Sequence, residues 1–173
     1  LNDDRIKGMI KSLDEIIKLK DPVGCIISEW HRPNGLHIQK ISIPLGVIGV
    51  IYESRPNVTV DASAISIKAG NAVILRGGTD SFFSSQKLKE IVSLSFSSVG
   101  LPDNIVQMIN TSDRSSVEAM LKLDKYIDVI IPRGGKNLMK LVKEKSLIPI
   151  IKHLEGICHI FVEKNADLNK AKK

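Results

Sequence analysis

The first 20 residues carry apolar side chains at the spacing of one helix face. This pattern predicts a helix that starts at Asp3 or Asp4, either of which could cap it, and that ends near Leu19. Its apolar face consists of Ile6, Met9, Ile10, Leu13, Ile16 and Ile17. Asp21 and Pro22 then end the helical pattern, because proline cannot continue a helix.

Two short extended segments, residues 25–30 and 36–43, flank the turn residues Pro33, Asn34 and Gly35. This arrangement predicts a β-hairpin. In the second segment apolar and polar residues alternate only imperfectly. A strand with one buried face alternates more strictly, so we expect the hairpin, at about residues 25–43, to be an edge or an arm.

From residue 45 onward, apolar runs of strand length alternate with helical patterns. Strands are predicted at residues 45–52, 72–75, 105–109, 127–131, 148–151 and 157–162. Helices are predicted at residues 57–68, 81–97, 114–123 and 136–145, and Asp167 is expected to cap a last one. Strands that alternate with helices across short loops predict a parallel sheet covered on both faces. The expected fold class is α/β of the Rossmann type, with residues 1–173 forming one domain that carries the small hairpin arm.

The loops after the predicted strands hold residues suited to binding an anion. All these loops lie at one edge of a parallel sheet, where ligands bind in folds of this kind. Gly77 and Gly78 follow the second strand, and Gly134 and Gly135 follow the fourth. Without Cβ atoms, their N–H groups can approach a phosphate closely. The cations expected to converge on the same edge are Arg55, Arg76, Arg133 and Lys136.

Glycine pairs also occur in ordinary turns, so a single pair would not indicate a ligand. Two pairs at the ligand edge, each next to an arginine, favour a nucleotide such as a dinucleotide. The standard fingerprints, G-x-G-x-x-G after a strand and G-x-x-x-x-G-K-[ST], are absent from the sequence. The pattern alone therefore predicts a nucleotide-binding α/β domain and nothing more specific.

Composition narrows the classes of partner. Hydrophobic residues make up 43% of the 173 residues, charged residues 25%, and the net charge is +6. The lysines are spread over helical segments beside glutamates, which favours a phosphate-bearing small ligand over nucleic acid. The longest apolar runs are only strand length, which argues against a membrane span. The two cysteines and four histidines lack the spacing of a zinc site, so no metal is expected.

The sequence begins without Met and without a signal-peptide pattern, and its end falls where a helix has barely begun. We therefore expect a fragment of a longer cytoplasmic protein, in which Cys25 and Cys158 are reduced.

Four long motifs, in order, resemble those of the γ-glutamyl phosphate reductases, also called glutamate-5-semialdehyde dehydrogenases, of the aldehyde dehydrogenase superfamily. The first is PLGVIGVIYESRPNVTVD at residues 44–61, and the others lie at residues 70–78, 123–135 and 156–162. Residues 21–24 are also similar. The resemblance covers essentially the whole chain, and it implies the cofactor-binding domain of such an enzyme.

The resemblance implies the NADPH-dependent reduction of L-glutamyl 5-phosphate to glutamate 5-semialdehyde in proline biosynthesis. A cysteine thiolate would attack the acyl phosphate, phosphate would leave, and hydride would reduce the thioester. An oxyanion develops in the first and last of these stages and requires stabilisation.

The resemblance also assigns roles to individual residues. Asn57 matches the asparagine that donates its side-chain amide to the oxyanion, although a plain helix cap remains an alternative. Arg76, Gly77 and Gly78 match the loop near the adenosine end of the cofactor. Arg133, Gly134 and Gly135 match the loop against its pyrophosphate or nicotinamide half. Thr79 and Asp80 stand where the family commonly has Lys-Glu, which leaves Arg76 to supply charge for a 2′-phosphate.

We do not expect the catalytic nucleophile within these 173 residues. Cys158 and His159 are adjacent on a predicted strand and would point to opposite faces, and their apolar neighbours favour a buried thiol. In the family, the catalytic cysteine follows the segment that Cys158 belongs to. Cys25 is a weaker candidate. Glu155 has no required role, because acyl-phosphate reduction activates no water, and His153 and His159 are expected to be structural.

Two other readings remain open at this point. The domain could belong to a bifunctional kinase–reductase, or it could be a non-catalytic nucleotide-binding module. The resemblance also suggests glutamate 5-kinase as a partner of the reductase. By analogy, the hairpin resembles the extension through which aldehyde dehydrogenases often dimerise, so we expect a homo-oligomer.

Overall fold

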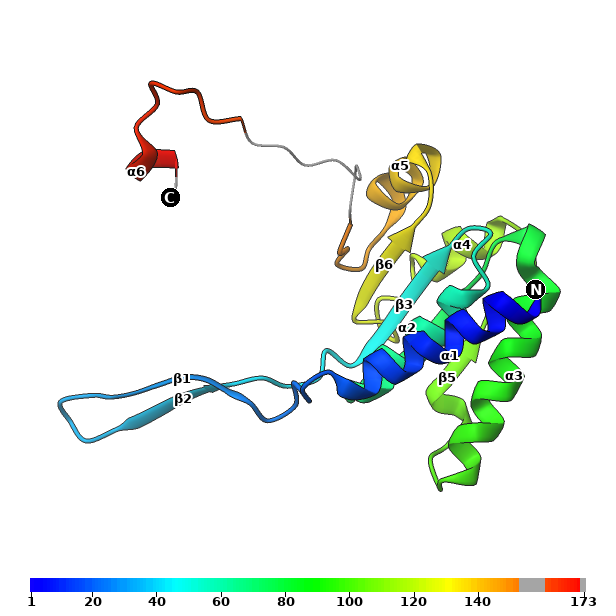
Figure 1. Ribbon diagram of the computed structural model, residues 1–173, viewed down its shortest axis with the longest axis horizontal. Helices are drawn as coiled ribbons and strands as arrows, with labels where there is room; N and C mark the ends of the chain where they lie inside the picture. Colours follow the sequence, from blue (N-terminus) through cyan, green and yellow to red (C-terminus); the bar gives the residue numbers. More distant parts are fainter. Residues whose placement is uncertain (153–160, 172–173) are drawn as a thin grey trace.

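A parallel four-stranded sheet forms the centre of the protein. The computed structural model describes residues 1–152 and 161–171. The sheet consists of β3 (Val47–Tyr52), β4 (Ala72–Arg76), β5 (Val106–Met108) and β6 (Val129–Arg133), in the spatial order β5-β4-β3-β6 (Figure 1). All three strand pairs are parallel. The predicted α/β fold class and these four strands are confirmed.

The segment 148–151, predicted as a fifth strand, lies beside β6 without forming a full strand. A single parallel bridge joins Ile130 to Ile150. The Ile130 amide donates to the Pro149 carbonyl at 2.8 Å, and the Ile151 amide donates to the Ile130 carbonyl at 2.9 Å. Proline has no amide hydrogen, so Pro149 cannot extend the ladder. Most of the strand expected at 157–162 lies outside the described residues, and Phe161 and Val162 are not in a strand.

Helices cover both faces of the sheet, as predicted. On one face, α2 (Asn57–Lys68) and α3 (Phe82–Ser98) cover a core that includes Val50, Val73 and Leu75. On the other, α4 (Ser115–Met120) and α5 (Lys136–Lys145) pack with Ile51 and Ile130. Successive residues of β3 enter opposite cores, because side chains alternate along a strand.

The remaining helices lie around this layered body. α1 (Asp3–Lys18) packs against α2, and the short 3-10 helices η1 (Thr79–Ser81) and η2 (Asp103–Ile105) precede α3 and β5. α1 is capped by Asn2, whose Oδ1 accepts the Arg5 amide at 3.1 Å, so the cap predicted at Asp3 or Asp4 was wrong. The two aspartates lie instead in the first turn, where their charge favours the helix dipole. Asp167 caps α6 (Leu168–Ala171) as predicted, since its Oδ1 accepts the Asn169 amide at 2.9 Å.

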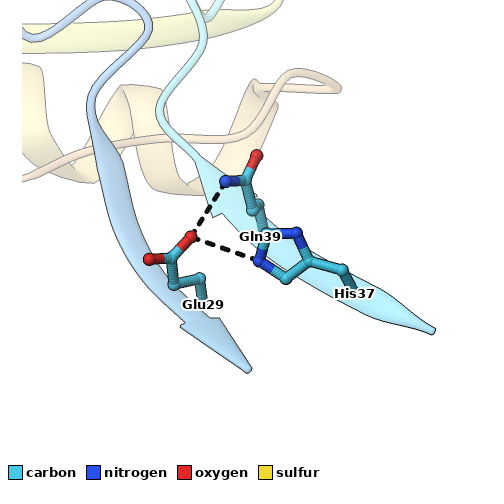
Figure 2. A network of polar contacts seen from close by, with 3 residues as sticks. All are labelled: Glu29, His37 and Gln39. Atoms are coloured by element: carbon cyan, nitrogen blue, oxygen red, sulfur yellow. Dashed lines mark hydrogen bonds and ion pairs between the residues drawn. The ribbon is translucent and has the colours of Figure 1, made fainter. Parts of the chain in front are cut away.

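The predicted hairpin is an arm that projects from the layered body (Figure 1). It pairs β1 (Ile26–His31) with β2 (His37–Ile41) in antiparallel register. Figure 2 shows the Glu29 carboxylate accepting from Gln39 Nε2 at 2.9 Å and lying 3.2 Å from His37 Nε2. The His31 ring stacks on the His37 ring with centroids 4.3 Å apart. With nearly every side chain exposed, such cross-strand pairs stabilise the arm.

The entry into β3 depends on Gly46, whose backbone φ is +115°. A Cβ at this position would collide with the Asp128 carboxylate, and that carboxylate accepts the Val47 amide at 2.8 Å. Both the backbone conformation and the lack of space therefore require glycine here.

We predict that Gly46→Ala lowers the free energy of unfolding by about 2–4 kcal/mol, through backbone strain and loss of the Asp128 contact. Gly8 in α1 is the matched control, because no heavy atom lies within 4 Å of its Cβ position. Gly8→Ala should stabilise the protein by about 0.5–1 kcal/mol through helix propensity. Urea unfolding measures both variants. Equal effects of the two substitutions would contradict this account of Gly46.

Candidate functional site

The carboxyl ends of the four strands lie at one edge of the sheet. The chain runs from β3 to β4 and β5 on one side, and then returns to place β6 on the other side of β3. In open α/β sheets, ligands bind outside the carboxyl ends where the strand order reverses in this way. The relevant loops are those after β3, β4 and β6.

Glu53, the first residue after β3, bridges this point of reversal. Its amide donates to the Arg133 carbonyl at 3.1 Å, and its Oε2 accepts the Gly135 amide at 2.9 Å. Gly135 precedes the first residue of α5, so the carboxylate lies where a helix N-terminus attracts an anion. Glu53 had no predicted role, although an acidic residue directly after the central strand was the available signal.

The two glycine pairs make room for the loop after β3. A Cβ on Gly134 would lie 2.6 Å from the Glu53 carboxyl carbon, and a Cβ on Gly78 would lie 2.7 Å from the Ser54 amide nitrogen. Ser54 has a φ of +35°, which is unusual for a residue other than glycine. The close approach expected at these glycines is therefore present, but in this structure its partner is the loop at residues 53–54.

Arg76, at the end of β4, is a buried cation whose N–H groups donate hydrogen bonds to backbone carbonyls. Nη1 donates to the Gly77 carbonyl at 2.9 Å, and Nη2 donates to the Ser112 and Asp113 carbonyls at 3.0 and 3.1 Å. The side chain is only 6% exposed. Burial lowers its pKa, with a further contribution from the nearby positive charge of Arg114. Arg76 thus joins the end of β4 to the loop before α4.

Asp113 also stabilises the loop before α4. Its two carboxylate oxygens accept the Ser115 amide at 3.0 Å and the Ser115 hydroxyl at 2.7 Å. These hydrogen bonds to the ionised form lower the pKa of Asp113. The start of α4 is therefore held by a carboxylate, which leaves the next residue, Arg114, at a defined place.

A cavity of about 370 Å³ lies at this edge, between the strand ends and helices α4 and α5. Its polar lining residues are Glu53, Ser54, Arg76, Thr79, Asp80, Arg114 and Asn137, and Gly78 contributes backbone. Of the four cations expected to converge, only Arg76 lines this cavity. Arg133, Gly134 and Gly135 lie beside it, against Glu53, rather than in its wall. Arg114 and Asn137 were not predicted as site residues, because they lie at helix starts without any distinctive motif.

Asn57 lies at a second cavity, of about 610 Å³, between the N-terminal parts of α1 and α2. Its Nδ2 donates to Asp61 Oδ2 at 3.2 Å, and Asp61 Oδ1 accepts the Ser12 hydroxyl at 2.8 Å. The N-cap position of α2 is Pro56, and within the described part of the chain no side-chain hydrogen bond caps this helix, so Asn57 is not the plain helix cap that was the alternative. An amide nitrogen carries two N–H groups, so within residues 1–152 and 161–171 one of them has no protein acceptor and is available to a ligand. Arg5 and Arg55 line the same cavity.

Tyr52 supports the loops from beneath. Its hydroxyl lies 2.7 Å from Thr59 Oγ1 in the core, and burial raises its pKa. A Cβ on Gly77 would lie 3.1 Å from the same hydroxyl. The loop after β4 therefore rests directly on this ring.

The other candidate residues from the sequence contribute little to the described site. His153, Glu155, Cys158 and His159 lie outside the described residues. Cys25 is half-buried near the base of the arm, and its thiol donates to the Asp21 carbonyl at 3.2 Å. Among residues 1–152 and 161–171, no group of three His, Cys, Asp or Glu side chains is placed to hold a metal ion. No helix in this part of the chain has the length and apolar character needed to cross a membrane.

Known proteins resemble this chain over nearly its whole length. The γ-glutamyl phosphate reductase of Paramagnetospirillum magneticum is 55% identical over 172 residues, which cover 99% of this chain and 41% of that protein. The chain thus spans about two-fifths of the length of the curated relatives it matches.

Solved structures give the same result. The γ-glutamyl phosphate reductase of Thermotoga maritima superimposes with a TM-score of 0.89 at 43% identity, over 99% of this chain and 41% of that one. The Saccharomyces cerevisiae enzyme of the same name gives 0.80 at 36% identity, over 99% and 43% of the two chains. The sequence model of the aldehyde dehydrogenase family matches residues 6–173, and the chain therefore belongs to the aldehyde dehydrogenase family.

Proposed function

We propose that this chain is the NADPH-binding region of a γ-glutamyl phosphate reductase. The reaction is the reduction of L-glutamyl 5-phosphate to L-glutamate 5-semialdehyde with release of phosphate, a step of proline biosynthesis. The observation that carries the proposal is the cavity at the carboxyl edge of the parallel sheet, with two arginines in its wall. Relatives of that name match the chain from end to end, which supports the same substrate.

The residues around the cavity suit a nicotinamide dinucleotide, the type of cofactor that membership of the family implies. When bound, this cofactor supplies hydride. The chain itself supplies the backbone of Gly78 in the cavity wall, with Gly77 packed on Tyr52 beside it, together with the positive charges of Arg76 and Arg114. Because the Glu53 carboxylate already accepts the Gly135 amide, a pyrophosphate would lie beside that carboxylate or displace it. We propose that Arg133, which is exposed next to this contact, offsets the negative charge of Glu53 and attracts the pyrophosphate.

We also propose that Asn57 is the oxyanion donor. The hydrogen bond from Asn57 Nδ2 to Asp61 fixes the orientation of the side-chain amide at the first turn of α2. The direction of the second N–H is then set by this contact. A donor held in place before the reaction stabilises developing charge without reorganisation. The adjoining 610 Å³ cavity, with Arg5 and Arg55 in its wall, offers cations for an anionic substrate.

NADPH binding tests the cofactor proposal. Titration followed by NADPH fluorescence should show binding to the chain, and Arg133→Glu should weaken it about tenfold or more, because an attractive charge becomes repulsive. Arg32→Glu, at the exposed turn of the arm, makes the same charge change at a residue that does not line the cavity and should leave the dissociation constant unchanged. Equal binding by wild type and Arg133→Glu would remove Arg133 from the site.

The substrate proposal can be tested in a chimera in which this chain replaces the matching region of the P. magneticum relative. The chimera should carry out phosphate-dependent oxidation of glutamate 5-semialdehyde. Asn57→Ala should lower kcat by about 10²–10³-fold with little change in KM, as loss of an oxyanion donor does. Asn104→Ala, an exposed asparagine away from both cavities, is the matched control. A folded chimera that binds NADPH but shows no turnover would refute the substrate, and an unchanged kcat would refute the role of Asn57.

A further inference from the structure

The charged groups that line the 370 Å³ cavity differ in how many hydrogen bonds they already make within the protein. The buried guanidinium of Arg76 donates to three backbone carbonyls, which leaves it poorly placed to change partners for a ligand. The carboxylate of Glu53 accepts the Gly135 amide, and that of Asp80 accepts the Ser54 hydroxyl at 3.0 Å. Within the described parts of the chain, the Arg114 side chain makes no hydrogen bond or ion pair. Arg114 is therefore the cation of this cavity with donors to offer.

The backbone around Arg114 is held in place although its side chain is exposed. Arg76 binds the carbonyls of Ser112 and Asp113, the two residues before it, and the Thr79 hydroxyl donates to the Ser112 carbonyl at 3.4 Å. These contacts bring the start of α4 against the loop at residues 76–80. The positive charge of Arg114 is close enough to help lower the pKa of Arg76. Arg114 therefore places an uncommitted positive charge in the wall of the cavity, beside the carboxylates of Glu53 and Asp80, where it attracts an anionic ligand group.

The position of the second strand of the βαβ unit indicates which ligand group this is. In dinucleotide-binding folds, an acidic residue beyond that strand accepts the ribose 2′-hydroxyl of NAD, and a nearby arginine accommodates the 2′-phosphate of NADP. Here β4 is the second strand, and Asp80 lies four residues beyond its last residue. Asp80 alone would favour NAD, and Thr79 adds no charge to oppose it. The arginine brought to this loop by the fold is Arg114.

We propose that Arg114 binds the ribose 2′-phosphate and so selects NADPH over NADH, an inference that rests on the cofactor binding proposed above. The planar guanidinium can donate two parallel hydrogen bonds to a phosphate. Its cation also offsets the repulsion between that phosphate and the Asp80 carboxylate. Selectivity for the phosphorylated cofactor then comes from the loop before α4, not from the loop after β4.

Titrations of the chain with NADPH and with NADH test this inference. Arg114→Gln should raise the dissociation constant of NADPH about tenfold or more, since a charge-assisted contact is lost, and should change that of NADH less than about twofold. Arg32→Gln in the arm turn is the matched control and should change neither. Urea unfolding should give the same stability for Arg114→Gln as for wild type, because the side chain is exposed.

A second variant separates a charge effect from a structural one. Thr79→Lys, added to Arg114→Gln, returns a cation to the same end of the cavity and should recover most of the lost NADPH affinity. Adenosine 2′,5′-bisphosphate should compete with NADPH better than adenosine 5′-monophosphate does, and Arg114→Gln should remove the difference.

The outcomes distinguish the two proposals. Equal weakening of NADPH and NADH, or no change in either, overturns the role of Arg114 and leaves cofactor binding intact. If the wild-type chain binds neither cofactor, both proposals fail.

Discussion

The buried guanidinium of Arg76 is the interaction on which the candidate site depends. A charge at 6% exposure is costly unless its hydrogen bonds are satisfied, and here backbone carbonyls of two loops satisfy them. Because both loops are bound to one rigid group, the end of β4 and the start of α4 cannot separate without exposing unpaired donors and carbonyls. The cavity is therefore built before any ligand arrives, which lowers the entropic cost of binding.

Glu53 links the carboxyl ends of β3 and β6, as Arg76 links the end of β4 to the start of α4. Its backbone amide and its carboxylate both bond to the loop after β6, across the point where the strand order reverses. Glycine at positions 78 and 134 is required for these loops to approach so closely. The negative charge of Glu53 lies at the start of α5, in the region that would attract the pyrophosphate of a dinucleotide. In the proposed function, the positive charge of Arg133 offsets this negative charge.

The fold could be predicted from the sequence because buried parallel strands and helical periods leave direct patterns. The apolar runs at 45–52 and 127–131 became β3 and β6, and the hairpin followed from its turn residues. The edge segment 148–151 fell short of a strand because Pro149 cannot donate, and periodicity does not register one missing amide hydrogen. Asn2 rather than Asp3 or Asp4 caps α1, a shift of the kind that cap chemistry alone does not resolve.

The candidate site was predicted less completely, for a different physical reason. The sequence correctly predicted that Arg76 and the glycines lie at the carboxyl edge of the sheet. It did not predict which groups they contact there. Whether an arginine faces a ligand or a carbonyl depends on loops that approach from 36 residues away, as Ser112 approaches Arg76. The surroundings of Arg114 and Glu53 likewise depend on how these loops pack together, so no role was predicted for either residue from the sequence.

Amide hydrogen exchange in the presence and absence of NADPH tests the central claim most directly, that interlocked loops at the carboxyl edge of the sheet form the cofactor site. The account predicts slower exchange at residues 76–80 and 112–117 when NADPH is bound, with the arm at residues 26–41 unchanged. Binding of NADPH without added protection in these two loops would contradict it.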